Sequence, residues 1–285
     1  MNLILRPGTI EDAEACGRIA YEAFKSIADQ HNFPSTKPSI EAATSVIMVR
    51  LSHPGFSSIV AELDGRIVGS TFLDERSVIA GGGPLSVDPA FMNAAIGRQL
   101  CEAMVGRAAQ RHFPGMRGVV NAWHYRALAL YTKFGGTIRE TLSVMQGQSL
   151  ALKIPGYGVR PAREADVSAC NRLCFRVHGH DRGGELVDAI REGGANVVER
   201  LGRITGYATG IGWYSHAVAE TNDDLKALIG TATEFTGVGF LLPSRNGDLL
   251  RWCLNKGLRV VFQANLMTSG LYNWPVGAYM PSSTY

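Results

Sequence analysis

The sequence contains the same pattern of residues twice. A first set returns in the same order 154 positions later: Arg6-Pro7, Asp12, Cys16 and Arg18 recur as Arg160-Pro161, Asp166, Cys170 and Arg172. A second set (Glu62, Gly65-Arg66-Ile67 and Gly69) returns after 137 positions and a third (Gly135 and Met145) after 122. The order is kept while the offset shrinks, which is typical of two copies of one fold in which the second has shorter loops.

The repeat predicts two domains. A chain of 285 residues is long enough for two units that each bury a core without metal or disulfide support. We expect them over residues 1–148 and 156–285, joined within a segment, 146–157, that holds two glycines and a proline. With 46% hydrophobic and 19% charged residues, the composition is that of a soluble globular protein and excludes disordered and fibrous classes.

The net charge and the lengths of the apolar runs limit the kinds of partner that we expect. The net charge is only +3 and the basic residues are scattered, so we expect no nucleic-acid partner. No apolar run approaches the roughly 18 residues of a membrane span, and residues 1–7 lack a signal-peptide pattern, which predicts a cytoplasmic protein without membrane contact. Among five cysteines, none in C-x-x-C spacing, Cys170 and Cys174 are expected in the core rather than in a redox or metal pair. The oligomeric state stays open, a homodimer included.

The hydrophobic patterns predict an α/β fold, with a mixed sheet and helices on both of its faces. A strand over residues 3–6 and an amphipathic helix return together at 157–178, and Asp64-Gly65 predicts a hairpin turn. The remaining elements expected in the first copy are a strand that ends at 89, a helix over 97–112, a strand over 118–122, a helix over 126–134 and a strand over 137–145.

One strand-to-helix junction has the composition of an anion site. Residues 85–89 end a strand, and residues 92–98 form a turn of small residues at the start of a helix. Such a junction offers unpaired backbone N–H groups and the positive end of a helix dipole, which together suit a pyrophosphate. An ordinary strand-to-helix turn is the alternative.

At this junction the chain resembles the GNAT acetyltransferase superfamily. The family carries Q/R-x-x-G-x-G/A here, and Met92, Ala95 and Gly97 stand at those positions. Met92 lacks the polar side chain of Gln or Arg. The resemblance implies two GNAT-like acyl-CoA N-acyltransferase domains in tandem, the first of which binds acetyl-CoA. The cofactor-binding residues that it implies are Leu85, Ser86, Val87, Met92, Asn93, Ala94, Ala95, Ile96, Gly97 and Arg98.

A second segment carries the resemblance further. Residues 124–136 are similar to the family's N-x-x-A-x-x-L-Y-x-K-x-G-F helix and match it at Ala127, Leu130, Tyr131, Lys133 and Gly135, while His124 replaces the asparagine and Gly136 the phenylalanine. The resemblance implies that Tyr131 protonates the departing CoA thiolate; a thiol pKa near ~8.5 and a tyrosine pKa near ~10 make this transfer feasible. The alternative is an aromatic residue that packs its helix on the sheet.

Acetyl transfer also needs a group that removes a proton from the acceptor amine. The sequence offers four candidates: Asp74 and Glu75 at the end of a strand, His124 at the start of the Tyr131 helix, and His31 in the loop after the first helix. A solvated hairpin turn is the alternative for Asp74 and Glu75.

The second copy lacks most of these features. Shifted by 122 positions, His124 maps to Asn246 and Tyr131 to Cys253. No turn of small residues leads into a long helix. We therefore expect a degenerate GNAT-like domain that shapes or closes the acceptor site, with the aromatic, proline-rich tail (270–285) packed across a surface.

Together these patterns predict an enzyme, a GNAT-type N-acetyltransferase that moves acetyl from acetyl-CoA to an amine of a small molecule or peptide by direct attack. A non-catalytic CoA-binding or small-molecule-sensing module is the alternative, because Met92, Ala95 and His124 depart from the common pattern. A longer acyl donor would keep the fold and change only the pocket.

Overall fold

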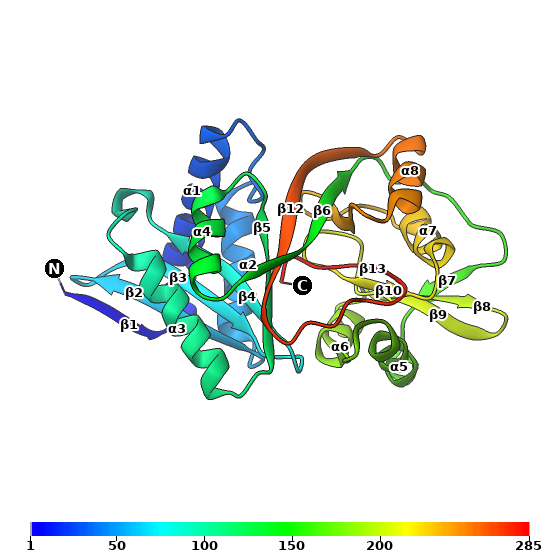
Figure 1. Ribbon diagram of the computed structural model, residues 1–285, viewed down its shortest axis with the longest axis horizontal. Helices are drawn as coiled ribbons and strands as arrows, with labels where there is room; N and C mark the ends of the chain where they lie inside the picture. Colours follow the sequence, from blue (N-terminus) through cyan, green and yellow to red (C-terminus); the bar gives the residue numbers. More distant parts are fainter. Residues whose placement is uncertain (1, 285) are drawn as a thin grey trace.

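The computed structural model describes residues 2–284 of the chain. Its elements run in the same order in the two copies, which confirms the repeat (Figure 1). The first copy consists of β1 (Leu3–Pro7), η1 (Ile10–Asp12), α1 (Ala13–Gln30), α2 (Ile40–Ser52), β2 (Phe56–Leu63), β3 (Arg66–Asp74), β4 (Ala80–Val87), η2 (Pro89–Phe91), α3 (Ile96–Gln110), β5 (Gly115–Asn121), α4 (Tyr125–Lys133) and β6 (Thr137–Gln146). The second consists of β7 (Gly158–Pro161), η3 (Glu164–Asp166), α5 (Val167–His178), α6 (Gly183–Arg191), β8 (Asn196–Arg200), β9 (Arg203–Ala208), β10 (Ala217–Ala219), α7 (Asn222–Thr231), β11 (Phe240–Pro243), α8 (Gly247–Asn255), β12 (Arg259–Gly270) and a further strand, β13 (Ala278–Met280).

The recurring residues form the same ion pairs in each copy. Arg6 pairs with Asp12 at 2.8 Å and with Glu62 at 2.9 Å, and Arg160 repeats both pairs at 2.7 Å. These contacts tie the first strand of each copy to the helix that follows it and to the neighbouring strand. The recurrence of these residues therefore reflects a shared structural support.

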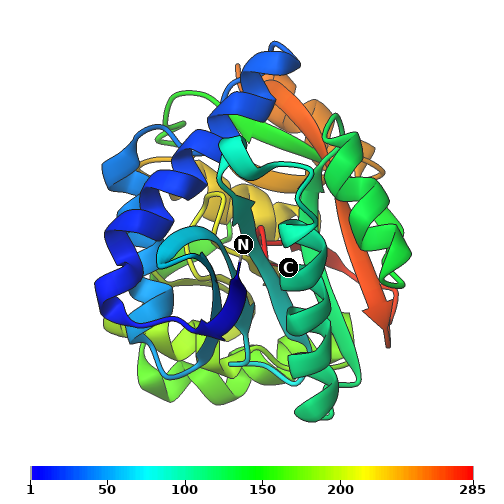
Figure 2. The ribbon, with the colours of Figure 1, turned by 90° about the vertical axis from the view of Figure 1, so that its left-hand side faces the viewer.

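Helices cover both faces of the strands in the first half, as the sequence predicts (Figure 2). Successive residues of a strand point to opposite faces of its sheet. Val60 and Phe72 are buried with residues of α1 and α2, whereas Ala61, which follows Val60 on β2, is buried with Ile96 and Leu100 of α3. α1 and α3 thus occupy opposite faces.

The two copies exchange strands. One sheet of eight strands has the order β1-β2-β3-β4-β5-β12-β6-β11, and a second sheet has the order β13-β10-β9-β8-β7. β12, from the second copy, lies between β5 and β6 of the first and pairs antiparallel with both. β6 in turn pairs with β11 of the second copy. Figure 1 shows β6 and β12 side by side between the two halves. The eight-stranded sheet thus combines strands of both copies, whereas the five-stranded sheet contains strands of the second copy alone.

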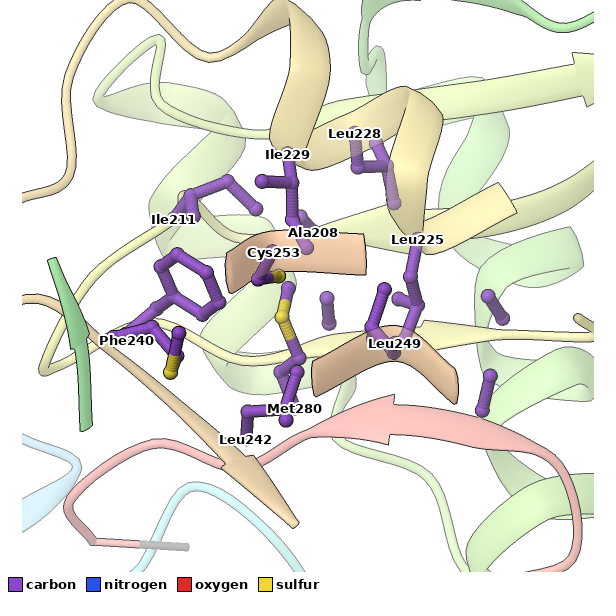
Figure 3. Packing of buried hydrophobic residues seen from close by; sticks show 14 of the residues in the cluster. Ala208, Ile211, Leu225, Leu228, Ile229, Phe240, Leu242, Leu249, Cys253 and Met280 are labelled. Carbon is purple, nitrogen blue, oxygen red and sulfur yellow. The ribbon is translucent and has the colours of Figure 1, made fainter. Parts of the chain in front are cut away.

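The hydrophobic core is also shared between the copies. A large cluster fills the second half between its sheet and the helices α7 and α8, and Met145 of β6 is a member of it. Figure 3 shows this cluster, labelled at Ala208, Ile211, Leu225, Leu228, Ile229, Phe240, Leu242, Leu249, Cys253 and Met280. A second cluster brings Trp123 of the first copy together with Trp213 and Phe262 of the second. Within residues 2–284, no helix is long and apolar enough to cross a membrane.

The cysteines belong to these cores. All five are buried and none forms a disulfide. Burial raises the pKa of Cys170 to about 12 and that of Cys174 to about 11, which keeps both thiols protonated and inert. The expectation that this pair consists of core residues is confirmed.

Candidate active site

The first copy opens a cleft where two parallel strands separate. β4 pairs with β5 only at Ala80 with Met116 and at Gly81 with Arg117. The pairing of β4 with β3 changes register between Gly82 and Leu85, and β4 runs apart from β5 from that point. The cleft between them has a volume of about 860 Å³ and is lined by residues of both copies. Backbone groups of β4 along this edge are thereby available to a ligand, whereas Val119 N–H of β5 donates to Ser283.

The predicted phosphate loop forms one wall of the cleft. All of its predicted cofactor-binding residues except Ala94 line the cleft: Leu85, Ser86, Val87, Met92, Asn93, Ala95, Ile96, Gly97 and Arg98. Asn93 and Ala95 have positive φ angles of 78° and 61°, a conformation that turns consecutive backbone N–H groups toward one side. The N–H groups in the first turn of α3 have no partners within the helix. The loop therefore has the donors that an anion needs.

Gly97 leaves space in this wall. A Cβ placed there would lie 3.6 Å from Val87 and 3.9 Å from Leu85, which are ordinary contact distances. Packing within the protein thus does not require glycine at this position. The backbone at Gly97 is therefore open to close approach from the cleft, which is the geometry that a pyrophosphate needs at a helix start.

The equivalent helix of the second copy is capped by side chains at its start. α7 begins after Thr221, whose hydroxyl and backbone N–H both donate to the carboxylate of Asp224 at 2.6 and 3.0 Å. Asp224 is fully buried and also accepts from Thr205. The start of α7 thus carries a capping box, whereas the start of α3 has no side-chain cap.

Tyr131 lines the cleft from α4 and packs among apolar residues. It contacts the cluster that contains Cys101 and Met104 of α3. Burial, together with the nearby Cys101 thiol, raises the pKa of Tyr131 well above its usual value of 10. The phenol therefore keeps its proton at neutral pH, as a proton donor must. The same shift makes it a weaker acid.

His124 lines the cleft at the start of α4. Its Nδ1 accepts a hydrogen bond from the backbone N–H of Ala127 at 3.4 Å, which leaves the ring proton on Nε2. Burial lowers the pKa of His124 to about 4, with smaller contributions from His31 and Arg126. The ring is neutral at physiological pH and is only a weak proton acceptor.

The other predicted bases are engaged elsewhere. Asp74 accepts from Arg76 at 2.9 and 2.6 Å, and Glu75 accepts from Arg107 at 2.7 and 3.0 Å. His31 packs against Trp123, with ring centroids 5.6 Å apart. None of the three lines the cleft, and we therefore assign none of them the role of the base.

The tail after β13 reaches the opening between β4 and β5. The carbonyl of Ser283 accepts from Val119 N–H of β5 at 3.1 Å, and its N–H donates to the carbonyl of Trp213 at 2.8 Å. Ser283 and Thr284 both line the cleft. The sequence predicts a tail packed across a surface but gives no signal for this position, because the contacts come from distant parts of the chain.

The cleft also contains residues that the sequence does not single out. Lys37 precedes α2, Arg50 lies on α2, and Trp213 and Tyr214 lie between β9 and β10 of the second copy. No regular spacing connects these positions. Only the assembled fold brings them to one wall.

Comparisons with known proteins agree with this architecture. Residues 54–135 match the profile of the acetyltransferase (GNAT) domain family. A proposed acetyltransferase from Pyrococcus horikoshii is 18% identical over 97% of this chain and 92% of its own, with a TM-score of 0.76. A GCN5-related N-acetyltransferase from Sphaerobacter thermophilus is 14% identical over 96% and 97%, with a TM-score of 0.63. A tandem GNAT protein from the clavulanic acid biosynthesis pathway is 14% identical over 94% and 98%, with a TM-score of 0.59. No curated protein matches the sequence.

Proposed function

We propose that the chain is a tandem GNAT protein, because the profile of that domain family matches residues 54–135 and the fold occurs in two copies, and that the first copy transfers acetyl from acetyl-CoA to an amine by direct attack. The observation that carries this proposal is the convergence of the α3 loop and Tyr131 on one cleft. The second copy contributes the wall opposite these groups and binds no cofactor.

Acetyl-CoA, which supplies an acetyl group activated as a thioester, is the co-substrate that fits this cleft. In our proposal the N–H groups of Ile96, Gly97 and Arg98 hold the pyrophosphate, with Met92 replacing a polar side chain that the backbone donors make dispensable. The apolar side chains of Leu85 and Val87 flank them. The bent edge of β4 offers further backbone groups to the arm that leads to the thioester.

Tyr131 acts on the leaving group. As the acceptor nitrogen forms the new C–N bond and the C–S bond breaks, the phenol donates a hydrogen bond to the sulfur and then gives it the proton, and the proton that the acceptor nitrogen loses regenerates the phenol. The raised pKa of Tyr131 makes complete transfer less favourable than for an ordinary tyrosine. Most of its contribution therefore comes from stabilising the charge that develops on the sulfur.

The pH profile should report the acceptor rather than the enzyme. No aspartate or glutamate in the described chain lines the cleft, and His124, with a pKa of about 4, is already neutral above pH 5. The raised pKa of Tyr131 keeps the phenol protonated as the pH rises. We expect kcat/KM to rise about tenfold per pH unit from pH 6 toward the pKa of the acceptor amine. A midpoint near pH 6 to 7 that is the same for amines of different pKa would instead reveal a base on the enzyme.

Replacing Gly97 by alanine tests the cofactor site. The added methyl group fits beside Val87 and Leu85 but fills the space that we assign to the pyrophosphate. We expect the Kd for acetyl-CoA, measured by calorimetry, to rise about tenfold while the fold stays intact.

Gly106→Ala is the matched control for this substitution. Gly106 lies on the same helix, and a Cβ there would meet no atom within 4 Å. We expect unchanged affinity and a gain in stability of about 0.5–1 kcal/mol. Equal acetyl-CoA affinity in both variants would contradict the proposed site. Binding without thiol release for any amine would favour the sensing alternative.

A further inference from the structure

Two buried cations stand in the wall of the cleft. Lys37 and Arg50 are only 4% and 8% exposed, and both residues line the cleft. Burying a charged side chain is costly unless an opposite charge and hydrogen bonds compensate for it. The groups around them therefore show whether the protein supplies that compensation.

The residues that the structure describes supply no anionic partner to Lys37 or Arg50. Among residues 2–284, no carboxylate lies within ion-pair distance of Lys37 or Arg50. Lys37 Nζ donates to the hydroxyl of Tyr214. Arg50 Nη1 donates to the carbonyl of Val46 at 3.2 Å, while its Nε is buried without a partner. Asp74 acts on Arg50 only at longer range, because its oxygens bond to Arg76.

Aromatic rings hold the two cations on one side of the cleft. Lys37 Nζ lies 4.9 Å and Arg50 Cζ 5.3 Å from the centroid of the Tyr214 ring. Arg50 also lies 5.6 Å from the ring of Phe56. These contacts fix the cations and offset part of the desolvation. They accept no hydrogen bond from the unused N–H of Arg50.

A third polar group points to the same ligand. Thr36 is 5% exposed and lines the cleft, and its hydroxyl is buried without a hydrogen-bond partner. Thr36 adjoins Lys37 in the segment between α1 and α2. One wall of the cleft thus contains two cations, an unused guanidinium N–H and an unused hydroxyl. The α3 loop, to which we assign acetyl-CoA, is not part of this wall.

We propose that Lys37, Arg50 and Thr36 bind a carboxylate of the acceptor, so that the enzyme acetylates an amine that itself carries a carboxylate, such as a free amino acid. This inference rests on the proposed acetyl transfer. A carboxylate matches the planar edge of a guanidinium and accepts from several donors at once. Arg50, whose Nη1 already bonds to Val46, has its Nε side left for this purpose. Charge thus selects an acceptor with a carboxylate at one end, and the apolar part of the cleft contacts the rest of the acceptor.

The test compares each amino acid with its own amide. Both contain the reacting amine, and only the acid contains the carboxylate. Thiol release from acetyl-CoA is measured with the proteinogenic amino acids, their amides and ethanolamine phosphate. Wild type is expected to prefer acids over amides by about 10- to 100-fold in kcat/KM, as a charged hydrogen-bonded contact implies.

Two variants separate binding of the carboxylate from other effects. Arg50→Gln and Lys37→Gln should each lower kcat/KM for acids about tenfold or more, change kcat/KM for amides less than about threefold, and leave the Kd for acetyl-CoA unchanged. The ratio of kcat/KM for an acid to kcat/KM for its amide is compared between wild type and each variant. Differences in reactivity between the two amines therefore cancel. Lys25→Gln is the control, since Lys25 is exposed on α1 and pairs with Asp29.

Each outcome decides the inference. Equal use of acids and amides by wild type, preference for ethanolamine phosphate, or an equal loss on acids and amides in the variants would overturn it. If the variants do not fold, the wild-type comparison alone decides. Acetyl-CoA binding with acetylation of neutral amines only would overturn the inference and leave the proposed function standing. Failure to bind acetyl-CoA would overturn the proposed function itself.

Discussion

Tyr131→Phe is expected to lower kcat about 100- to 1,000-fold, because the variant loses the only donor on α4 that we place beside the departing sulfur. The ring that packs near Cys101 and Met104 is kept, so the fold and the Kd for acetyl-CoA should change little. Thiol release at saturating acetyl-CoA measures the first effect and calorimetry the second.

A control on the same helix is available for this variant. Tyr125 begins α4, is 66% exposed and does not line the cleft. Tyr125→Phe should keep kcat within about twofold of wild type. If Tyr131→Phe behaves like Tyr125→Phe, Tyr131 is only a packing residue of the cleft wall, which is the alternative that the sequence leaves open.

Removing the tail after Met280 is expected to lower kcat/KM for the amine more than about 100-fold, because small displacements of groups that position a substrate have effects of this size. The truncation leaves Val119 N–H and the Trp213 carbonyl without the partners that Ser283 gives them. Tyr214, which follows Trp213 and contacts Lys37, then loses its support. In the described part of the chain, no backbone hydrogen bond joins the α3 loop to Ser283, so acetyl-CoA should still bind.

A milder variant guards against loss of the fold. Ser283→Pro removes the N–H that donates to Trp213, fixes φ at position 283, and keeps the carbonyl that accepts from Val119. It should weaken amine turnover in the same direction with less effect on stability. Wild-type amine kinetics in both the truncated protein and Ser283→Pro would show that the tail has no part in the acceptor site.

Local features of the chain were predictable from the sequence. The order of the elements and the DG hairpin follow from hydrophobic periodicity and turn chemistry, which act between near neighbours. The α3 loop was predictable for the same reason, since small residues after a strand are a local signal. Asp64 and Gly65 indeed have positive φ angles of 49° and 83°.

Long-range features were not predictable in this way. Arg107 lies on α3, far from Glu75 in the sequence. The ion pair between them therefore could not be predicted from the position of Glu75 at the end of a strand, which made it a candidate base. The insertion of β12 between β5 and β6 depends on pairing between distant residues such as Leu266 and Val119. The alternation of side chains along β12 would be the same in either sheet, so it does not indicate which strands are the neighbours of β12. The wall that contains Lys37 and Tyr214 depends in turn on how the two copies meet.

The strand exchange sets an order of events during synthesis. The ribosome releases all of the first copy, through β6, before β12 exists, yet β12 must lie between β5 and β6 in the finished sheet. Until residues 259–270 emerge, β5 has one unpaired edge along its whole length. Such an exposed edge is a site for wrong pairing with other chains. The first copy is therefore open to wrong pairing at β5 for as long as residues 259–270 have not been made.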